Sequence, residues 1–128
     1  MVPIPHTPFA GSNQPLYEIK ANLFKALAHP VRIRILEILS AAGEPTPVRE
    51  ILADTGIEPT LLSQHLSVLK RHHVVRAERI GNAVLYEVTY PEIPELLRIA
   101  RQFLAHTLAA SRDQLEAIDT LPPIAAGR

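Results

Sequence analysis

The stretch TPVREILADTGIEPTLLSQHLSVLKR, residues 46–71, carries two runs of apolar residues at helical spacing on either side of a glycine. We expect Thr46 to cap a short helix that has Pro47 at its first position. Gly56 breaks this helix, and Pro59 begins a second helix whose exposed face is polar. Two such helices joined by a short glycine turn are typical of a helix-turn-helix.

The flanking sequence predicts two helices before this motif, and a hairpin and a long helix after it. Apolar spacing indicates helices over 16–28 and 30–42, and the second should be central because apolar positions surround most of it. β-branched and aromatic residues predict strands within 74–79 and 83–90, joined by a glycine–asparagine turn. A long amphipathic helix over 92–119 follows.

This order predicts a mainly α fold with a β-hairpin wing, that is, a winged helix-turn-helix of about five helices and a two-stranded wing. Proline-rich residues 1–15 are expected to be a flexible arm, and residues 120–128 a flexible tail, around a domain over 16–119. Most other prolines fall where the periodic pattern changes, so they mark the ends of elements.

The first and last helices carry more apolar surface than a small helical unit with a wing can cover. Such uncovered stripes are most simply buried against a second copy of the chain. We therefore expect a homodimer in which both end helices take part. The residues predicted to dimerise are Leu16, Ile19, Leu23, Leu96, Ala100, Phe103, Leu104, Leu108 and Leu115.

The composition is that of one globular domain. The 128 residues are 47% hydrophobic and 20% charged, with 13 basic and 13 acidic side chains. The lack of cysteine excludes disulfides, thiolate metal sites and thiol redox switches. There is no signal-peptide pattern and no apolar run of about 20 residues, so we expect a cytoplasmic protein without a membrane partner.

The second helix of the motif separates its residues by polarity. One side carries Leu62, Leu66 and Leu69, and a solvated surface would be the simplest explanation of the other. That other side has no acidic residue, however, whereas solvated helices usually mix both signs. It consists of Thr60, Ser63, Gln64, Ser67 and Arg71, with Lys70 at its edge and His65 as a flank.

These side chains suit the reading of duplex DNA. Short groups that donate and accept hydrogen bonds fit the major groove, where Gln64 can pair with adenine. Residues 60–82 also hold four Lys or Arg residues against one acid, which indicates phosphate contact in a chain without net charge. We expect Lys70 and Arg71 to meet the DNA backbone, and Arg79 next to the wing tip to reach a phosphate or the adjacent minor groove.

The histidines of this helix do not form a chelating set. His65 and His72 are roughly 10 Å apart along a helix, whereas two ligands of one zinc ion need a spacing of four residues. His73 is expected to pack on the core or to end the helix. No Gly-rich phosphate loop, nucleophile elbow or zinc-protease motif is present, so we do not expect an enzyme.

Three segments resemble the ArsR/SmtB family of bacterial winged-helix repressors. They are FKALAHPVRIRILEIL (24–39), TLLSQHLSVLKRHHVV (60–75) and RAERIGNAVLYEV (76–88), and the resemblance covers roughly residues 16–118. It implies a homodimer, paired through its first and last helices, that binds an inverted-repeat operator. The second helix of the motif would enter successive major grooves, with the wings at the flanks.

The resemblance also implies roles for single residues. Base or phosphate contacts fall to Thr60, Ser63, Gln64 and His65, with Lys70 and Arg79 supporting them on the backbone. Family members commonly release DNA when an effector binds, often a metal ion. The cysteine pair of one family metal site is absent from this chain. Of another site on the last helix only His106 fits, with Glu92 as a possible substitute. Since His106 is otherwise an ordinary polar residue, we predict no metal site and no cofactor.

These observations predict a sequence-specific DNA-binding transcriptional regulator, a repressor that an unknown effector releases. The alternative is a metal-responsive repressor with a non-thiolate site on the last helix. An organic small molecule is the other candidate effector, and the first and last helices are the expected lining of its pocket. A constitutive DNA binder would need no such pocket, and a protein–protein module would lack the cationic excess.

Overall fold

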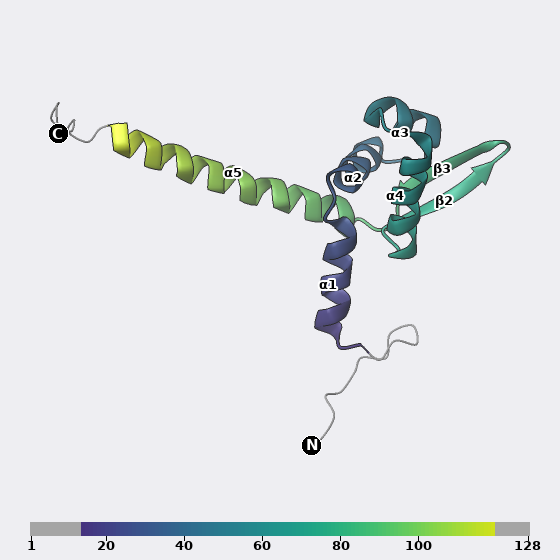
Figure 1. The fold of residues 1–128 in the computed structure, drawn as a ribbon, viewed down its shortest axis with the longest axis horizontal. Helices are drawn as coiled ribbons and strands as arrows, with labels where there is room; N and C mark the ends of the chain where they lie inside the picture. Colours follow the sequence, from purple (N-terminus) through teal and green to yellow (C-terminus); the bar gives the residue numbers. More distant parts are fainter. Residues whose placement is uncertain (1–13, 120–128) are drawn as a thin grey trace, which may run out of the picture. The chain divides into compact units, whose positions relative to one another are not determined.

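The computed structural model describes residues 14–119 (Figure 1). Residues 1–13 and 120–128, which hold most of the expected arm and the expected tail, lie outside the described residues. The chain divides into two compact units, Met1–Pro94 and Glu95–Arg128. The elements in order are α1 (Leu16–Leu27), α2 (Pro30–Ala42), β1 (Thr46–Pro47), α3 (Val48–Thr55), α4 (Pro59–Arg71), β2 (Val75–Ile80), β3 (Ala83–Val88) and α5 (Glu92–Asp119).

The core of the first unit surrounds α2, which packs on α3, α4 and β3. This confirms the prediction that the second helix is central. Apolar side chains from four elements and from the turn after α4 exclude water there, which is the main stabilising term of the fold. The largest fully buried side chains are Ile35, Leu36, Leu39, Ile51, Leu62, Leu66, Leu69, Val74 and Val75.

The predicted stops of α2 and α3 are confirmed, and both have a local cause. Gly43 and Gly56 follow the two helices with φ of 65° and 67°, a left-handed conformation that favours glycine. At its other end, α2 begins at Pro30, and the backbone N–H of Val31 donates to His29 Nδ1 at 3.1 Å. The histidine therefore acts as the N-cap of the central helix.

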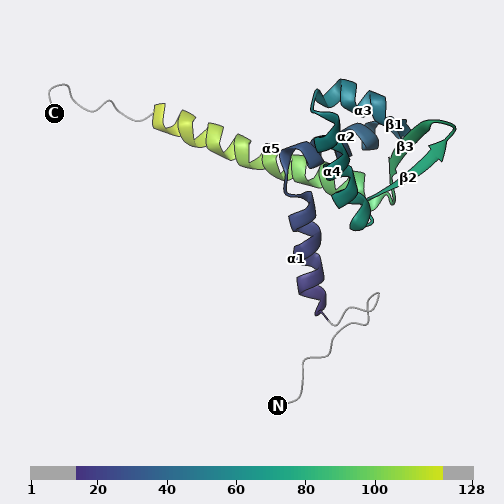
Figure 2. The same ribbon diagram turned by 45° about the vertical axis from the view of Figure 1, so that its right-hand side comes forward.

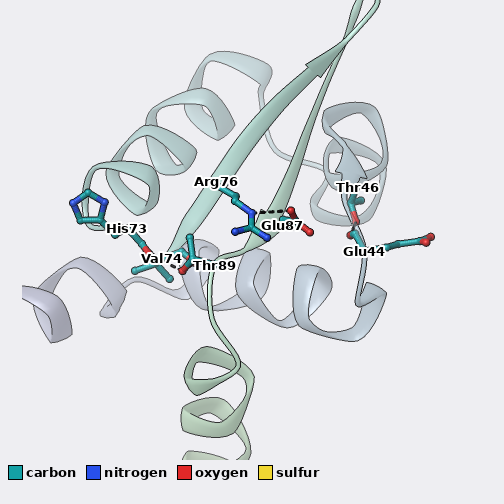
Figure 3. A network of polar contacts seen from close by, with 7 residues as sticks. All are labelled: Glu44, Thr46, His73, Val74, Arg76, Glu87 and Thr89. Carbon is teal, nitrogen blue, oxygen red and sulfur yellow. Dashed lines mark hydrogen bonds and ion pairs between the residues drawn. The ribbon is translucent and has the colours of Figure 1, made fainter.

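The prediction that Thr46 caps the third helix is wrong. Thr46 and Pro47 form β1, which pairs antiparallel with β3, so the sheet has three strands in the order β1-β3-β2 (Figure 2). Thr46 is buried, and its hydroxyl donates to the carbonyl of Glu44 at 3.1 Å (Figure 3). The free edge of β3 needs backbone partners, and a two-residue strand supplies them where proline is tolerated.

The predicted hairpin is confirmed and projects from the helices (Figure 1). β2 and β3 pair antiparallel from Val75↔Val88 to Ile80↔Ala83. Gly81, with φ of 61°, occupies the first of the two turn positions and Asn82 the second, and only Gly81 has a positive φ. This is the pattern of a type II′ turn, which matches the twist of the paired strands.

The long last helix is also confirmed, as α5 runs without a break from Glu92 to Asp119. Its second half consists entirely of exposed residues wherever side chains are described. None of the helices within residues 14–119 combines the length and the apolar character that crossing a membrane would require.

Candidate nucleic-acid interface

The polar side of α4 is exposed, as predicted. Three leucines at positions 62, 66 and 69 are at most 2% exposed, so they fix which side of the helix faces the core. The opposite side then projects outward with hydroxyl, amide and cationic groups and without a carboxylate. The exposed residues of this polar side are Thr60, Ser63, Gln64, Ser67, Lys70 and Arg71.

The prediction that His65 flanks this polar side is wrong. His65 is 6% exposed, its ring lies against His29, and its Nδ1 is 3.3 Å from Nη1 of Arg32. At 100° per residue, His65 lies beyond the edge of the leucine side, where the start of α2 covers it. A buried ring does not reach a base edge, so we leave His65 out of the DNA contacts.

A carboxylate does lie at the start of α4, on Glu58 immediately before the first helical residue Pro59. The backbone N–H of Thr60 donates to the side chain of Glu58 at 3.2 Å, so Glu58 caps the helix. Helix N-termini are frequent partners of DNA phosphates, because their free N–H groups attract anions. Glu58 satisfies one of these groups and places negative charge beside the polar side.

The end of α4 is fixed by an unusual residue. His73 has φ of 60°, its N–H donates to Lys70 at 3.0 Å, and the N–H of Val74 donates to Leu69 at 3.0 Å. These two bonds form a Schellman motif with histidine where glycine is usual. His73 is exposed, so it follows the helix end and does not pack on the core.

Thr89 holds the same turn from the far end of the hairpin (Figure 3). Its hydroxyl lies 2.6 Å from the carbonyl oxygen of His73 and 3.1 Å from that of Val74, and its N–H donates to Val74 at 3.1 Å. Thr89 therefore ties the end of the hairpin to the backbone of the turn that ends α4. Next to this turn, burial lowers the pKa of His72, and Arg71, His73 and Arg32 lower it further.

The wing carries fewer free cations than the sequence indicates. Nε of Arg76 lies 2.8 Å from a carboxylate oxygen of Glu87 on the paired strand (Figure 3), and this bond raises the pKa of Arg76. Arg79, close to the tip, is exposed and makes no ion pair in the described part of the chain. Arg79 is therefore the wing cation that remains available to an anion.

Sequence reasoning missed Arg49. This exposed residue of α3 lines a hollow of about 540 Å³ together with Ile80 and Asn82 of the wing tip. It makes no ion pair among residues 14–119. The first helix of a helix-turn-helix crosses the DNA backbone, so an arginine at the start of this helix was a usable signal in the sequence.

Comparisons with known proteins agree with this arrangement. A family model described as a helix-turn-helix domain matches residues 27–77. Rv0081, an HTH-type transcriptional regulator of Mycobacterium tuberculosis, is 50% identical over 98 residues, which are 76% of this chain and 84% of that protein. The SmtB repressor of the same bacterium is 35% identical over 91 residues, 71% of this chain and 58% of that protein.

The chain belongs to the ArsR/SmtB family of helix-turn-helix transcriptional regulators. The crystal structure of Rv0081 matches the fold with a TM-score of 0.70 at 49% identity, over 77% of this chain and 97% of that one. The homodimeric winged helix-turn-helix DNA-binding domain of Mb0332 from Mycobacterium bovis matches with a TM-score of 0.66 at 27% identity, over 78% and 94%. As a member of a family of regulators, the chain is not an enzyme.

This ArsR/SmtB-family regulator exposes most of the residues predicted to dimerise. On α1, Leu16 is 46% exposed, and Ile19 and Leu23 are half-buried. On α5, Leu96 lies one turn into the helix. The remaining predicted positions of α5 are all exposed, namely Ala100, Phe103, Leu104, Leu108 and Leu115.

His106, the single candidate metal ligand, is exposed on α5. Within the described residues, no three His, Asp or Glu side chains come together as a metal site would require. The regulator instead has a largely apolar hollow of about 470 Å³ beside α1 and the end of α4. Its lining includes Ile19, Leu23, Val74, Tyr90 and Ile93.

Proposed function

We propose that the regulator is a repressor that binds an inverted-repeat operator as a homodimer. The observation that carries this proposal is the polar side of α4, which is exposed, free of carboxylates and held outward by three buried leucines. α4 would lie in the major groove of each half-site, and we call it the recognition helix. SmtB is named as a repressor, which supports this mode of control.

Within this proposal the exposed residues divide into two groups. Thr60, Ser63 and Gln64 lie in the first half of the recognition helix, where helix-turn-helix proteins contact base edges, and Ser67 continues the same face. Cations at the periphery neutralise phosphates, which makes the affinity depend on salt. These cations are Lys70 and Arg71 at the helix end, Arg79 on the wing and Arg49 on α3.

The homodimer follows from apolar surface that the chain leaves uncovered. Tyr17 and Phe24 on α1 are 63% and 56% exposed, and Phe103 and Leu108 on α5 are 64% and 69% exposed. Soluble monomers rarely expose so many large apolar side chains along two helices. A second copy buries them and places two recognition helices at the spacing of successive major grooves.

The test is to select binding sites from a random duplex pool and to measure affinity for the enriched sequence. We expect an inverted repeat, bound by a species with the mass of two chains. Gln64→Ala should lose about 1–3 kcal/mol of binding free energy at one base pair of each half-site and relax the preference there. Gln114→Ala on α5 is the matched control and should keep the wild-type preference.

Either of two results would overturn the proposal. One is a wild-type chain that enriches no sequence over the starting pool. The other is a Gln64→Ala variant that discriminates operator from mutated operator as well as the wild type, because Gln64 would then read no base.

A second candidate function, release by an effector, is favoured by the hollow beside α1. Its volume of about 470 Å³ and its apolar lining suit a small organic molecule better than a metal ion. Adding Zn²⁺, Ni²⁺ or Co²⁺ to the operator complex distinguishes an organic effector from a metal effector. We expect no release by these ions, whereas release that His106→Ala abolishes would favour the metal-responsive alternative.

A further inference from the structure

The recognition helix is attached to the start of α2 through one buried histidine. The rings of His65 and His29 have centroids 4.4 Å apart, and Nδ1 of His65 is 3.3 Å from Nη1 of Arg32. Arg32 is itself held, because its Nε donates to the carbonyl of Ala26 at 2.6 Å. Three groups at the junction of α1 and α2 thus fix the position of His65.

Only one protonation state of His65 fits these contacts. A guanidinium has donors and no acceptor, so Arg32 donates and Nδ1 of His65 must be unprotonated. A neutral ring then carries its proton on Nε2. This atom is buried without a hydrogen-bond partner in the described part of the chain. The structure therefore holds His65 as the neutral tautomer protonated at Nε2.

The surroundings oppose a second proton on this ring. Burial lowers the pKa of His65 below its ordinary value of 6.5, and His29 and then Arg32 lower it further. Both neighbours come from the start of α2. Among the described residues, α1 and β2 also pack near the helix but supply no charged or titratable group that acts on His65.

No described counter-ion offsets this arrangement. No carboxylate lies within 4 Å of Arg32 or His65 in the described part of the chain. Nδ1 of His29 already accepts the N–H of Val31. A protonated His65 would point an N–H at the N–H groups of Arg32. It would also be a buried cation beside another cation. The repulsion between the two cations is relieved most simply when the His65 ring leaves its site.

We propose that Arg32 and His29 position the recognition helix through neutral His65, and that specific operator binding therefore weakens on acidification. The operator part rests on the proposed function. His65 directly follows Ser63 and Gln64, so displacement of its ring moves the residues that read bases. Arg32 and His65 are thus positioning residues and not DNA contacts.

The sign of the effect follows from proton linkage. A histidine with a lowered folded pKa adds stability above its ordinary pKa of 6.5 and loses it as the pH falls through the lowered value. Each subunit of a dimer takes up one proton on losing the arrangement, so the specific affinity falls by up to about a hundredfold per pH unit. Added positive charge strengthens non-specific binding, so the ratio of the two affinities is the sensitive quantity.

The first experiment needs no DNA. Two-bond ¹H–¹⁵N correlation of the histidine rings in the full chain reports which ring nitrogen carries the proton. Near neutral pH we expect His65 to show an unprotonated Nδ1 and a protonated Nε2. The opposite tautomer would overturn the contact with Arg32, whatever becomes of the proposed function.

The second experiment measures the ratio of operator to non-operator affinity from about pH 8 to about pH 5. We expect the ratio to fall with pH in the wild type and in the control His106→Gln, whose side chain is exposed on α5. His65→Gln should give a flat ratio, because a glutamine oxygen accepts from Arg32 at every pH. A flat wild type, or a fall that persists in His65→Gln, would overturn the proposal.

The Arg32→Met variant tests the coupling between Arg32 and His65 even if His65→Gln does not fold. Since Arg32 lowers the pKa of His65, its removal should move the midpoint of the fall to higher pH. An unchanged midpoint would exclude Arg32 from the coupling. A wild type that binds no duplex selectively would instead refute the proposed function, while the ring tautomer would still test the contact.

Discussion

The helices α4 and α5 are both amphipathic, but only α4 covers its apolar side within the described chain. Leu62, Leu66 and Leu69 of α4 are at most 2% exposed, whereas Phe103 and Leu108 of α5 are at least 64% exposed. An apolar stripe at helical spacing therefore indicates that a helix packs against an apolar partner, but it does not identify that partner. The orientation of α4 is encoded in contacts of its own chain, while we expect that of α5 to be encoded in the dimer.

The largest expected effect on stability comes from truncating a buried leucine of α4. Leu66→Ala should lower the free energy of unfolding by about 2–5 kcal/mol, because it removes buried methyl groups and leaves a cavity in the core. Urea unfolding at fixed protein concentration measures this loss. The dimer dissociation constant of the folded variant, from sedimentation, should stay unchanged, and a large increase would show that the two helices are not independent.

The corresponding change on α5 should act on association. Leu108→Ala is expected to weaken the dimer by about 1–3 kcal/mol, the range of a buried interface residue. Sedimentation at several concentrations gives the dissociation constant, and Arg112→Ala on the same helix is a polar control. If Leu108→Ala left the dimer intact, the exposed stripe of α5 would need another explanation.

Local chemistry explains what could be predicted from the sequence. Gly43 and Gly56 end their helices through their own backbone conformation, and the turn at Gly81 depends on neighbouring residues alone. The three buried leucines of α4 follow from spacing on one helix. All of these features are decided within a few residues, and for this reason the fold and the polar side of α4 could be predicted without a structure.

The features that could not be predicted depend on partners far along the chain. Thr46 lies in a strand because it pairs with Tyr86, forty positions later, on the free edge of β3. His65 became buried because Arg32 and His29 cover its side of the helix, and a helical wheel gives an angle without showing what lies there. Arg76 forms an ion pair with Glu87 because the register of the hairpin places the two residues opposite each other.

The smallest expected effect concerns the turn that ends α4. His73 holds φ of 60°, which costs a residue with a Cβ about 1–2 kcal/mol relative to glycine. His73→Gly should therefore raise the free energy of unfolding by about 0.5–1 kcal/mol, after the greater freedom of glycine in the unfolded chain is subtracted. The bond from Thr89 is kept, because it ends on the backbone carbonyl of residue 73.

The neighbouring histidine is the matched control for this change. His72 has φ of −92°, so His72→Gly gains nothing in the folded state and should lower stability by about 0.5–1 kcal/mol. Opposite signs at two adjacent histidines would show that the left-handed turn at His73 contributes to ending α4. If His73→Gly lowered stability as well, the left-handed residue would carry no strain, and the end of α4 would be set by Thr89 and the hairpin alone.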